Sequence, residues 1–454
     1  MEIPESNNDL PDILDQVKVG LNWLLKMQKD DGAVFHKVDS EPDFAYGFGP
    51  DEDPHSRKLS DPNNLSTIDA ADFTAVIAHA SRVFEPFDST FSETCKTAAL
   101  KSWEWVQNNP GIGQLDVYYT DSQTWKEETW AKAEIYMLTE DQSILGDLYV
   151  EIRTKEISLP TWTKPQMLSY ASLYNFPGIP ATVKSWIKLK VENYANNLKE
   201  VVDNSGYGSA INKYNWGWGT NTFMSNAGAT FIYAYMISQD KSWLYYASQQ
   251  LDYLLGRNSL NYSFVTGVGT NYCKQPFHWI TKTYGIVPSG IIGQGAVGNS
   301  LINLPNVDNI VKDLMHAGFP SAKIYVDSVD SWNSNEVGIY TVSSFAFLAG
   351  YLALHNRNIE ITDAQIIKTE SSSELIISDK NKTLFCENCI GETQIQLFSL
   401  NGQLLFNSEI KSHNNMFQLV NYIEFIERNP IILYNVTDET GRGKTGKLSF
   451  TLIP

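Results

Sequence analysis

Basic residues are scarce in this chain of 454 residues. Lysine and arginine number 34 against 52 aspartate and glutamate residues, which leaves a formal net charge of −18 at pH 7. Nucleic-acid binding draws much of its affinity from basic side chains that neutralise phosphate groups. With this excess of acidic residues, we do not expect the protein to bind nucleic acid.

Long apolar runs are also missing, so no membrane span is expected, because a membrane-spanning helix requires roughly 20 apolar residues. The first eight residues, MEIPESNN, have neither the basic nor the apolar region of a secretory signal. Cysteine is rare, with four residues. Cys386 and Cys389 form a single C-x-x-C pair, which favours a lone disulfide of a secreted domain over a metal or redox site.

Aromatic residues are plentiful, at 12% of the chain. They supply a large core and could also line a sugar-binding cleft. Apolar residues at helical spacing recur from residue 1 to about 357, separated by long polar loops rich in glycine. They predict helices strung along the chain, near residues 13–25, 73–84, 93–107, 130–138, 182–202, 221–237, 243–255 and 341–355.

The pattern changes after His355. Short apolar runs with strand character follow, and Asn401-Gly402 stands between two of them, which is a strong signal for a β-hairpin. Residues 362–454 are therefore expected to form a small all-β sandwich. A generic β-module, including a carbohydrate-binding one, is the alternative.

The most informative segment runs from Tyr325 to Glu336, YVDSVDSWNSNE, just ahead of an apolar helical run. It places carboxylates and a tryptophan in one short loop. A carboxylic acid on a fixed loop, beside a ring that can stack on a sugar, is what cleavage of a glycosidic bond requires. A polar surface loop that caps a helix is the structural alternative.

This segment resembles the proton-donor signature of glycoside hydrolase family 9, a family made up largely of cellulases. The aromatic, aspartate, second aromatic and acid positions of that signature correspond here to Tyr325, Asp327, Trp332 and Glu336. Other segments are similar to the family in the same order along residues 2–355. They are residues 1–38, 66–78, 130–136, 251–258 and 264–271.

The resemblance implies an all-α (α/α)6 toroid over residues 1–357, missing its first helices, followed by the β-sandwich. It also implies an inverting endoglucanase that acts on β-1,4-glucan, as a polysaccharide or oligosaccharide. Glu336 would donate the proton, with its pKa raised by a partly apolar site to which Trp332 contributes. Asp327 would position the substrate or the loop.

The second family signature departs from the pattern in this chain. After Pro276 the family has a substrate-binding histidine, any residue and an arginine, whereas this sequence has Phe277, His278 and Trp279. Two rings thus replace a hydrogen-bond donor and a guanidinium fork, which removes polar contacts to the sugar hydroxyls. Rings can still stack on a pyranose, so Trp279 stays a candidate for substrate binding. His278 is a second candidate, with a structural role as its alternative.

Two further features of the family are altered. Many members bind calcium through an acidic pair at the position of Lys126-Glu127, and a lysine there argues against calcium, so that no metal and no cofactor are expected. The Asp-Ala-Gly-Asp motif of the catalytic base occurs nowhere in the 454 residues. Asp69-Ala-Ala-Asp72 is similar only superficially, because it belongs to a later helix. These departures predict an impaired hydrolase, with a non-catalytic glycan-binding pseudoenzyme as the rival.

Two expectations concern substrate binding and export. Tyr214, Trp216 and Trp218, in KYNWGWG, are candidate sugar platforms, with plain packing as the alternative for each. The C-terminal runs at residues 397–405, 431–436 and 446–450 resemble the sorting domain of the type IX secretion system. That resemblance implies export machinery as a partner and a secreted or cell-surface protein.

Overall fold

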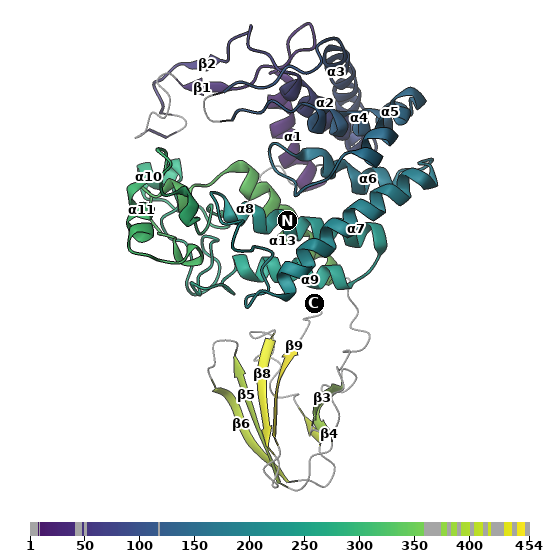
Figure 1. Cartoon of the computed structure of the whole chain (residues 1–454). Coiled ribbons are helices and arrows are strands. Elements are labelled where there is room, and N and C mark those ends of the chain that lie inside the picture. The colour runs from purple at the N-terminus through teal and green to yellow at the C-terminus, as the bar shows by residue number, and fades with distance from the viewer. Residues whose placement is uncertain are drawn as a thin grey trace. The chain divides into compact units, whose positions relative to one another are not determined.

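The chain divides into two compact units, Met1–Leu352 and Ala353–Pro454. A computed structural model describes residues 8, 10–40, 48–49, 52–116 and 119–357, together with the strands that follow residue 357. The regular secondary structure of the first unit is almost all helical, with long loops between the helices, and the described part of the second consists of the end of a long helix and of strands (Figure 1). The expected division into a catalytic domain over 1–357 and a sorting domain over 362–454 stays a prediction.

The long helices lie where the apolar spacing predicts them. Each expected helix is confirmed, with ends within a few residues for most. The observed helices are α1 (Asp12–Leu25), α2 (Thr67–Phe84), α3 (Ser89–Asn108), α4 (Trp125–Thr139), α7 (Ala181–Asp203), α8 (Thr220–Ser238), α9 (Ser242–Leu254) and α13 (Ile339–Arg357).

Several elements were not predicted from the sequence, including α5 (Gln142–Thr154), whose Leu145, Leu148 and Ile152 do repeat at helical spacing. Most are too short to show a period, and the three-residue strands β1 (Val38–Ser40) and β2 (Arg57–Leu59) form an isolated antiparallel pair. The remaining elements are α6 (Tyr170–Asn175), α10 (Trp279–Tyr284), α11 (Asn309–His316), α12 (Trp332–Asn335) and the 3₁₀ turns η1 (Pro165–Ser169), η2 (Asn299–Leu301) and η3 (Ser321–Lys323).

Local signals explain where the helices begin and end. The side chain of Ser66 accepts a hydrogen bond from the backbone N–H of Asp69 at the start of α2, and Asp88 caps α3 in the same way. Gly256 follows the end of α9 with φ +125°, a conformation that glycine adopts without steric cost. Side chains thus satisfy free backbone N–H groups at the start of α2 and α3.

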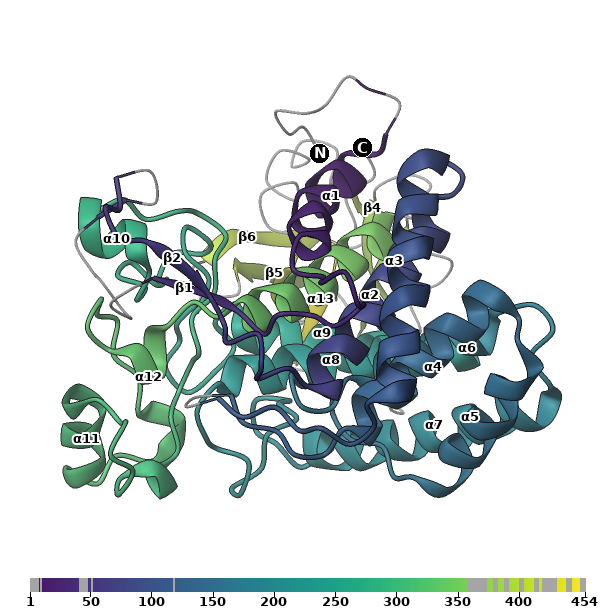
Figure 2. The same ribbon diagram turned by 90° about the horizontal axis from the view of Figure 1, so that it is seen from above.

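The helical unit has two large apolar clusters. One gathers buried side chains from α4 to α9 and from α13, and the other from α1 to α4, with α4 contributing to both. Helix α2 packs against α3 and α4, and α8 packs against α9 and α7, so that neighbours in sequence are neighbours in space (Figure 2). This serial pairing leaves the long loops to build the surface that carries the chemistry.

The second unit contains two antiparallel sheets among its described residues. One has the order β3–β4–β7, and the other has the order β6–β5–β8–β9. The pairing of β5 with β6 is the hairpin expected around Asn401-Gly402, although the turn itself and Cys389 lie outside the described residues. That the sheets form a sandwich stays a prediction. The strands are β3 (Glu374–Ser378), β4 (Thr383–Glu387), β5 (Glu392–Ser399), β6 (Leu404–Lys411), β7 (Met416–Gln418), β8 (Ile431–Thr437) and β9 (Gly443–Ser449).

None of the described helices is both long enough and apolar enough to cross a membrane.

Candidate active site

Glu336 stands between two helices, at the end of α12 and just before α13. The sequence suggested a loop here, and the structure corrects that expectation, because residues 332–335 form a short helical turn. The N–H of Glu336 closes that turn on the carbonyl of Trp332 at 3.2 Å. The three residues between them, Asn333, Ser334 and Asn335, are fully buried. The acid therefore sits on a packed backbone.

The carboxyl group of Glu336 lies in a partly apolar setting. Burial raises its pKa above the ordinary value, and a hydrogen bond with the side chain of Gln294 opposes part of that shift. Tyr340 and Tyr119 both lie within the electrostatic field of Glu336, whose charge raises the pKa of each phenol further after burial has done so. A carboxyl group with a raised pKa stays protonated closer to neutral pH, as a general acid must.

Asp327 holds two loops together instead of pointing into open space. Its carboxylate accepts hydrogen bonds from the backbone N–H groups of Lys274 and Gln275, both at 2.8 Å, and from the hydroxyl of Tyr262 at 2.8 Å. It also accepts one from the amide of Asn335 at 3.1 Å. These contacts join the 273–275 segment to the residue that precedes Glu336.

The altered signature lies directly beside the acid. The N–H of Phe277 donates to the carbonyl of Asn335 at 2.8 Å, and the N–H of Val337 donates to the carbonyl of Phe277 at 3.4 Å. Phe277 and Glu336 thus face each other as an isolated parallel bridge. Two segments that stand about sixty residues apart in the sequence are brought together at this point.

Three of the predicted binding residues surround this bridge. The ring of Trp332 meets that of Phe277 edge to face at 6.4 Å, and its indole N–H donates to the carbonyl of Asn306 at 3.0 Å. His278 precedes α10 and Trp279 is its first residue. The Nδ1 atom of His278 is buried without a hydrogen-bond partner, and burial lowers the pKa of the imidazole. A neutral histidine with an unsatisfied nitrogen is consistent with either role left open for it.

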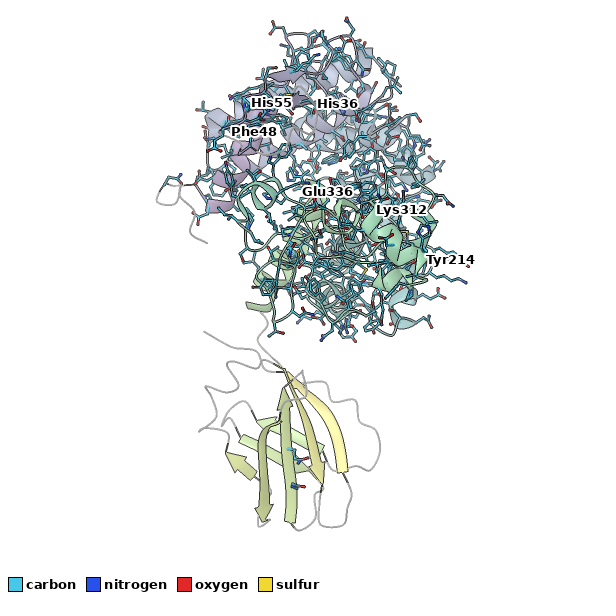
Figure 3. All side chains as sticks on the ribbon, turned by 90° about the vertical axis from the view of Figure 1, so that its left-hand side faces the viewer. His36, Phe48, His55, Tyr214, Lys312 and Glu336 are labelled. Atoms are coloured by element: carbon cyan, nitrogen blue, oxygen red, sulfur yellow. The ribbon has the colours of Figure 1, made fainter. Side chains whose placement is uncertain are left out.

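Another predicted platform, Tyr214, lies away from Glu336. Figure 3 labels Tyr214 and Glu336 and shows them well apart. Tyr214 is 80% exposed and pairs with the ammonium of Lys213, whereas Trp216 packs partly buried against the larger apolar cluster. Trp218 is about one-third exposed. Packing therefore accounts for Trp216, while Tyr214 and Trp218 remain available at the surface.

Tyr119 and Trp162 are site residues that the sequence did not reveal. Their rings meet edge to face at 5.4 Å, and each side chain stays close to half exposed. The charge of Glu336 also raises the pKa of the Tyr119 phenol. The sequence places each of these aromatic residues in a polar loop, which is a weak signal for a binding site. Only the folded structure shows that the two rings form a pair.

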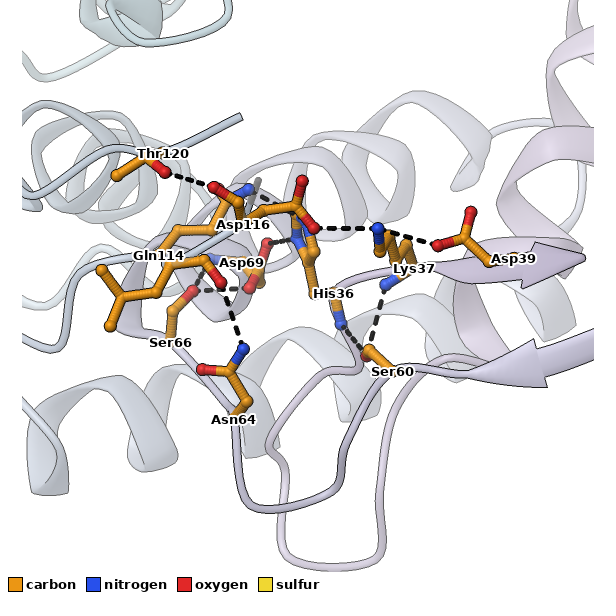
Figure 4. Close-up of polar contacts among 11 residues, drawn as sticks. His36, Lys37, Asp39, Ser60, Asn64, Ser66, Asp69, Gln114, Asp116 and Thr120 are labelled. Carbon is orange, nitrogen blue, oxygen red and sulfur yellow. Dashed lines mark hydrogen bonds and ion pairs between the residues drawn. The ribbon is translucent and has the colours of Figure 1, made fainter. Parts of the chain in front are cut away.

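The two aspartates of the Asp69-Ala-Ala-Asp72 segment have structural environments that do not suit a catalytic base. Asp69 accepts a hydrogen bond from Ser66 and lies 2.9 Å from Nδ1 of His36, and Lys37 pairs with Asp116 at 2.9 Å (Figure 4). The hydrogen bond to Asp69 raises the pKa of His36. Burial raises the pKa of Asp72 well above its usual range. Neither carboxyl group therefore resembles the exposed ionised base of an inverting hydrolase.

A metal ion finds no obvious set of ligands in the described part of the chain, where no group of three or more His, Cys, Asp or Glu side chains is arranged to hold one. At the position where the family carries a calcium ligand, the ammonium of Lys126 donates to the carbonyl of Thr163 at 3.1 Å. A cationic side chain does not fit a calcium donor set, which consists of oxygen atoms.

A half-buried acid on a packed turn, beside exposed aromatic rings in a helical unit, fits a glycosidase-type site. The chain belongs to glycosyl hydrolase family 9, because the model of that family matches residues 1–349. The mostly helical first unit fits the (α/α)6 barrel of this family.

Individual relatives agree with this assignment. Endoglucanase D of Acetivibrio thermocellus is 29% identical over 381 residues, which cover 80% of this chain and 54% of the relative. A xyloglucan-specific endo-β-1,4-glucanase of Bacteroides ovatus is 28% identical, over 78% of this chain and 62% of the relative. A metagenome-derived family 9 endoglucanase of known structure superposes with a TM-score of 0.69 at 28% identity, over 77% of this chain and 63% of that one. The chain thus spans about half the length of the curated relatives it matches.

Proposed function

We propose that this chain carries the acid half of a β-1,4-glucan hydrolase of endoglucanase type. The observation that carries the proposal is Glu336, a half-buried carboxyl group with a raised pKa on a packed turn within a family 9 chain. Relatives named as endoglucanases support the substrate class and the reaction.

In this reaction Glu336 donates its proton to the oxygen of the leaving sugar as the glycosidic bond breaks. Its raised pKa keeps the proton on the carboxyl group until the transition state needs it. The hydrogen bond with Gln294 stabilises the carboxylate that forms. Asp327 and Asn335 act indirectly, because they fix the turn that carries the acid.

The exposed rings around the acid are suited to bind the glucan. Tyr119 and Trp162 form one pair of rings, and Trp332 with Phe277 forms another. Pyranose rings present C–H faces that pack on aromatic side chains, whose apolar area contributes strongly to binding. Trp279, His278, Tyr214 and Trp218 stay weaker candidates for contacts with the chain of sugars.

An inverting mechanism needs a second carboxyl group that activates water, roughly 6.5–9.5 Å from the acid. The Asp-Ala-Gly-Asp motif that supplies it in the family is absent from the 454 residues. Since a general acid or base contributes about 10²–10⁴-fold to the rate, this chain should hydrolyse cellulose slowly. Adding a preceding segment that carries the motif should raise the turnover, and an unchanged turnover would contradict this explanation.

Exposed apolar side chains on α1 support the proposal that further helices of the toroid pack there. Ile13, Val17, Val19 and Trp23 are between 46% and 63% exposed, and Leu21 is the buried residue of this helix. Further helices of the toroid would cover this surface and stabilise it by burying apolar area. The melting temperature should rise when the preceding segment is joined to the chain.

The rival function is a glycan-binding protein without catalysis, and Phe277 is the observation that favours it. Its position beside Glu336 puts a ring where the family has a histidine that binds substrate. Release of reducing ends from soluble cellulose derivatives, measured beside pull-down on insoluble cellulose, separates the two. Binding without release, even when a preceding segment that carries the Asp-Ala-Gly-Asp motif is joined, and unchanged in Glu336→Gln, would establish the binding protein and refute the hydrolase.

For localisation, we propose that residues from about 362 onward serve export through a type IX system. The hairpin formed by β5 and β6 supports a β-rich module there. Deleting residues 362–454 from a version that carries a signal peptide should trap the protein in the periplasm with its activity intact. Continued export with lost activity would show that the segment handles substrate instead.

A further inference from the structure

Lys126 is a charged side chain in an unusual place. It is only 8% exposed and lies in the first turn of α4, which begins at Trp125. The N-terminus of a helix carries a partial positive charge, so a lysine there is electrostatically unfavourable. A buried lysine in this position calls for compensating contacts.

The contact that Lys126 makes leads towards the acid. Its ammonium donates to the carbonyl of Thr163 at 3.1 Å. Thr163 follows Trp162, whose ring packs on that of Tyr119 at 5.4 Å. Tyr119 lies in the electrostatic field of Glu336. One side chain on α4 is thus connected, through the loop of Trp162, to the ring of Tyr119.

The loop that carries Tyr119 is held separately. Gln114 and Asp121 exchange backbone hydrogen bonds at 2.7 and 3.2 Å, and the side chain of Asn64 donates to the carbonyl of Leu115 at 3.2 Å. Tyr119 therefore has its own support. The loop of Trp162 is linked to α4 by the 3₁₀ turn η1, which follows it and packs on that helix, and by the hydrogen bond from Lys126.

We propose that Lys126 is a positioning residue whose ammonium group takes the place of a bound cation. It ties the first turn of α4 to the loop of Trp162 and so holds that ring against Tyr119 beside Glu336. One part of the inference rests on the proposed function, namely that the rings of Tyr119 and Trp162 bind glucan. It also states that this tie needs no calcium, in contrast to the family members that place an acidic pair here.

The test follows Trp162 directly. The chain is labelled with 5-fluorotryptophan, and the ¹⁹F resonance of Trp162 is assigned by its loss in Trp162→Phe. In Lys126→Met this resonance should move by more than its line width, because the ring loses its support. Lys126→Arg keeps a donor for the Thr163 carbonyl and should restore the position.

Lys132→Met is the matched control, because Lys132 lies on the same helix and pairs with Glu151 instead. It should leave the Trp162 resonance unchanged. Binding of cellotetraose should weaken about tenfold in Lys126→Met, or about 1.4 kcal/mol, and stay unchanged in Lys132→Met. A Trp162 resonance that does not respond to Lys126→Met would overturn the proposal.

Calcium provides a test on the unaltered protein, which decides the question even if Lys126→Met does not fold. The melting temperature should be the same with millimolar calcium and with a chelator. A rise with calcium, accompanied by a shift of the Trp162 resonance, would show that an ion holds these loops and would overturn the inference. Failure of the unaltered chain to bind cellotetraose, with the ¹⁹F responses as expected, would refute the proposed function and leave the tie in place.

Discussion

Replacing Asp327 by asparagine removes the charge that joins the 273–275 segment to the turn of Glu336. The carboxylate accepts two backbone N–H groups, the hydroxyl of Tyr262 and the amide of Asn335. An asparagine has one acceptor oxygen, so at least one of these donors loses its partner. A hydrogen bond to a charged group contributes about 1.5–3 kcal/mol, and we expect a loss of about 3 kcal/mol in the free energy of unfolding.

Thermal unfolding measures this loss. A large domain loses about 2 °C of melting temperature per kcal/mol, so Asp327→Asn should melt about 6 °C lower. Asp330→Asn is the matched control, because Asp330 stands in the same loop with an exposed side chain that pairs with Lys282. An exposed ion pair contributes about 1 kcal/mol or less. Equal melting temperatures for the two variants would refute the role assigned to Asp327.

Two further predictions concern pH. The hydrogen bond to Asp69 raises the pKa of His36 above 6.5. The folded protein therefore binds this proton more tightly than the unfolded chain does. The resulting stabilisation is complete below pH 6.5 and is lost as the pH rises through the raised pKa. Melting temperatures of His36→Asn, followed between about pH 6 and 8, should lack that decline, whereas a decline equal to that of the unaltered chain would exclude His36 as its source. Gln294→Met removes a hydrogen bond that lowers the pKa of Glu336, so the alkaline limb of the pH–rate profile should move to higher pH. A limb that stays or moves down would contradict the assignment of that limb to Glu336.

The long helices could be predicted from the sequence because their apolar residues repeat over several turns. Helix α7 is one such case, with Val183, Ile187 and Val191 buried at intervals of four residues. The short α12 could not, because four residues contain a single turn and no period. The three-residue strands β1 and β2 are similarly invisible, since their pairing is the only feature that defines them.

The site divides in the same way. Glu336 and Asp327 could be proposed because they lie nine residues apart in one contiguous motif. The pairing of Tyr119 with Trp162, and the bridge between Phe277 and Glu336, depend on how distant loops meet. The position of Tyr214 also depends on the fold, which leaves its side chain away from the acid (Figure 3), and its role as a sugar platform stays a prediction.

The dependence of catalysis on the leaving group tests the role of Glu336 most directly. Two substrates are compared in the unaltered chain and in Glu336→Gln: cellotetraose, whose departing sugar needs a proton, and 2,4-dinitrophenyl β-cellobioside, whose departing phenolate does not. If Glu336 is the acid, kcat/KM should fall about 10²-fold or more on cellotetraose and change little on the dinitrophenyl substrate. Equal losses on both substrates would contradict the account, because they would show that Glu336 supports the site without donating the proton.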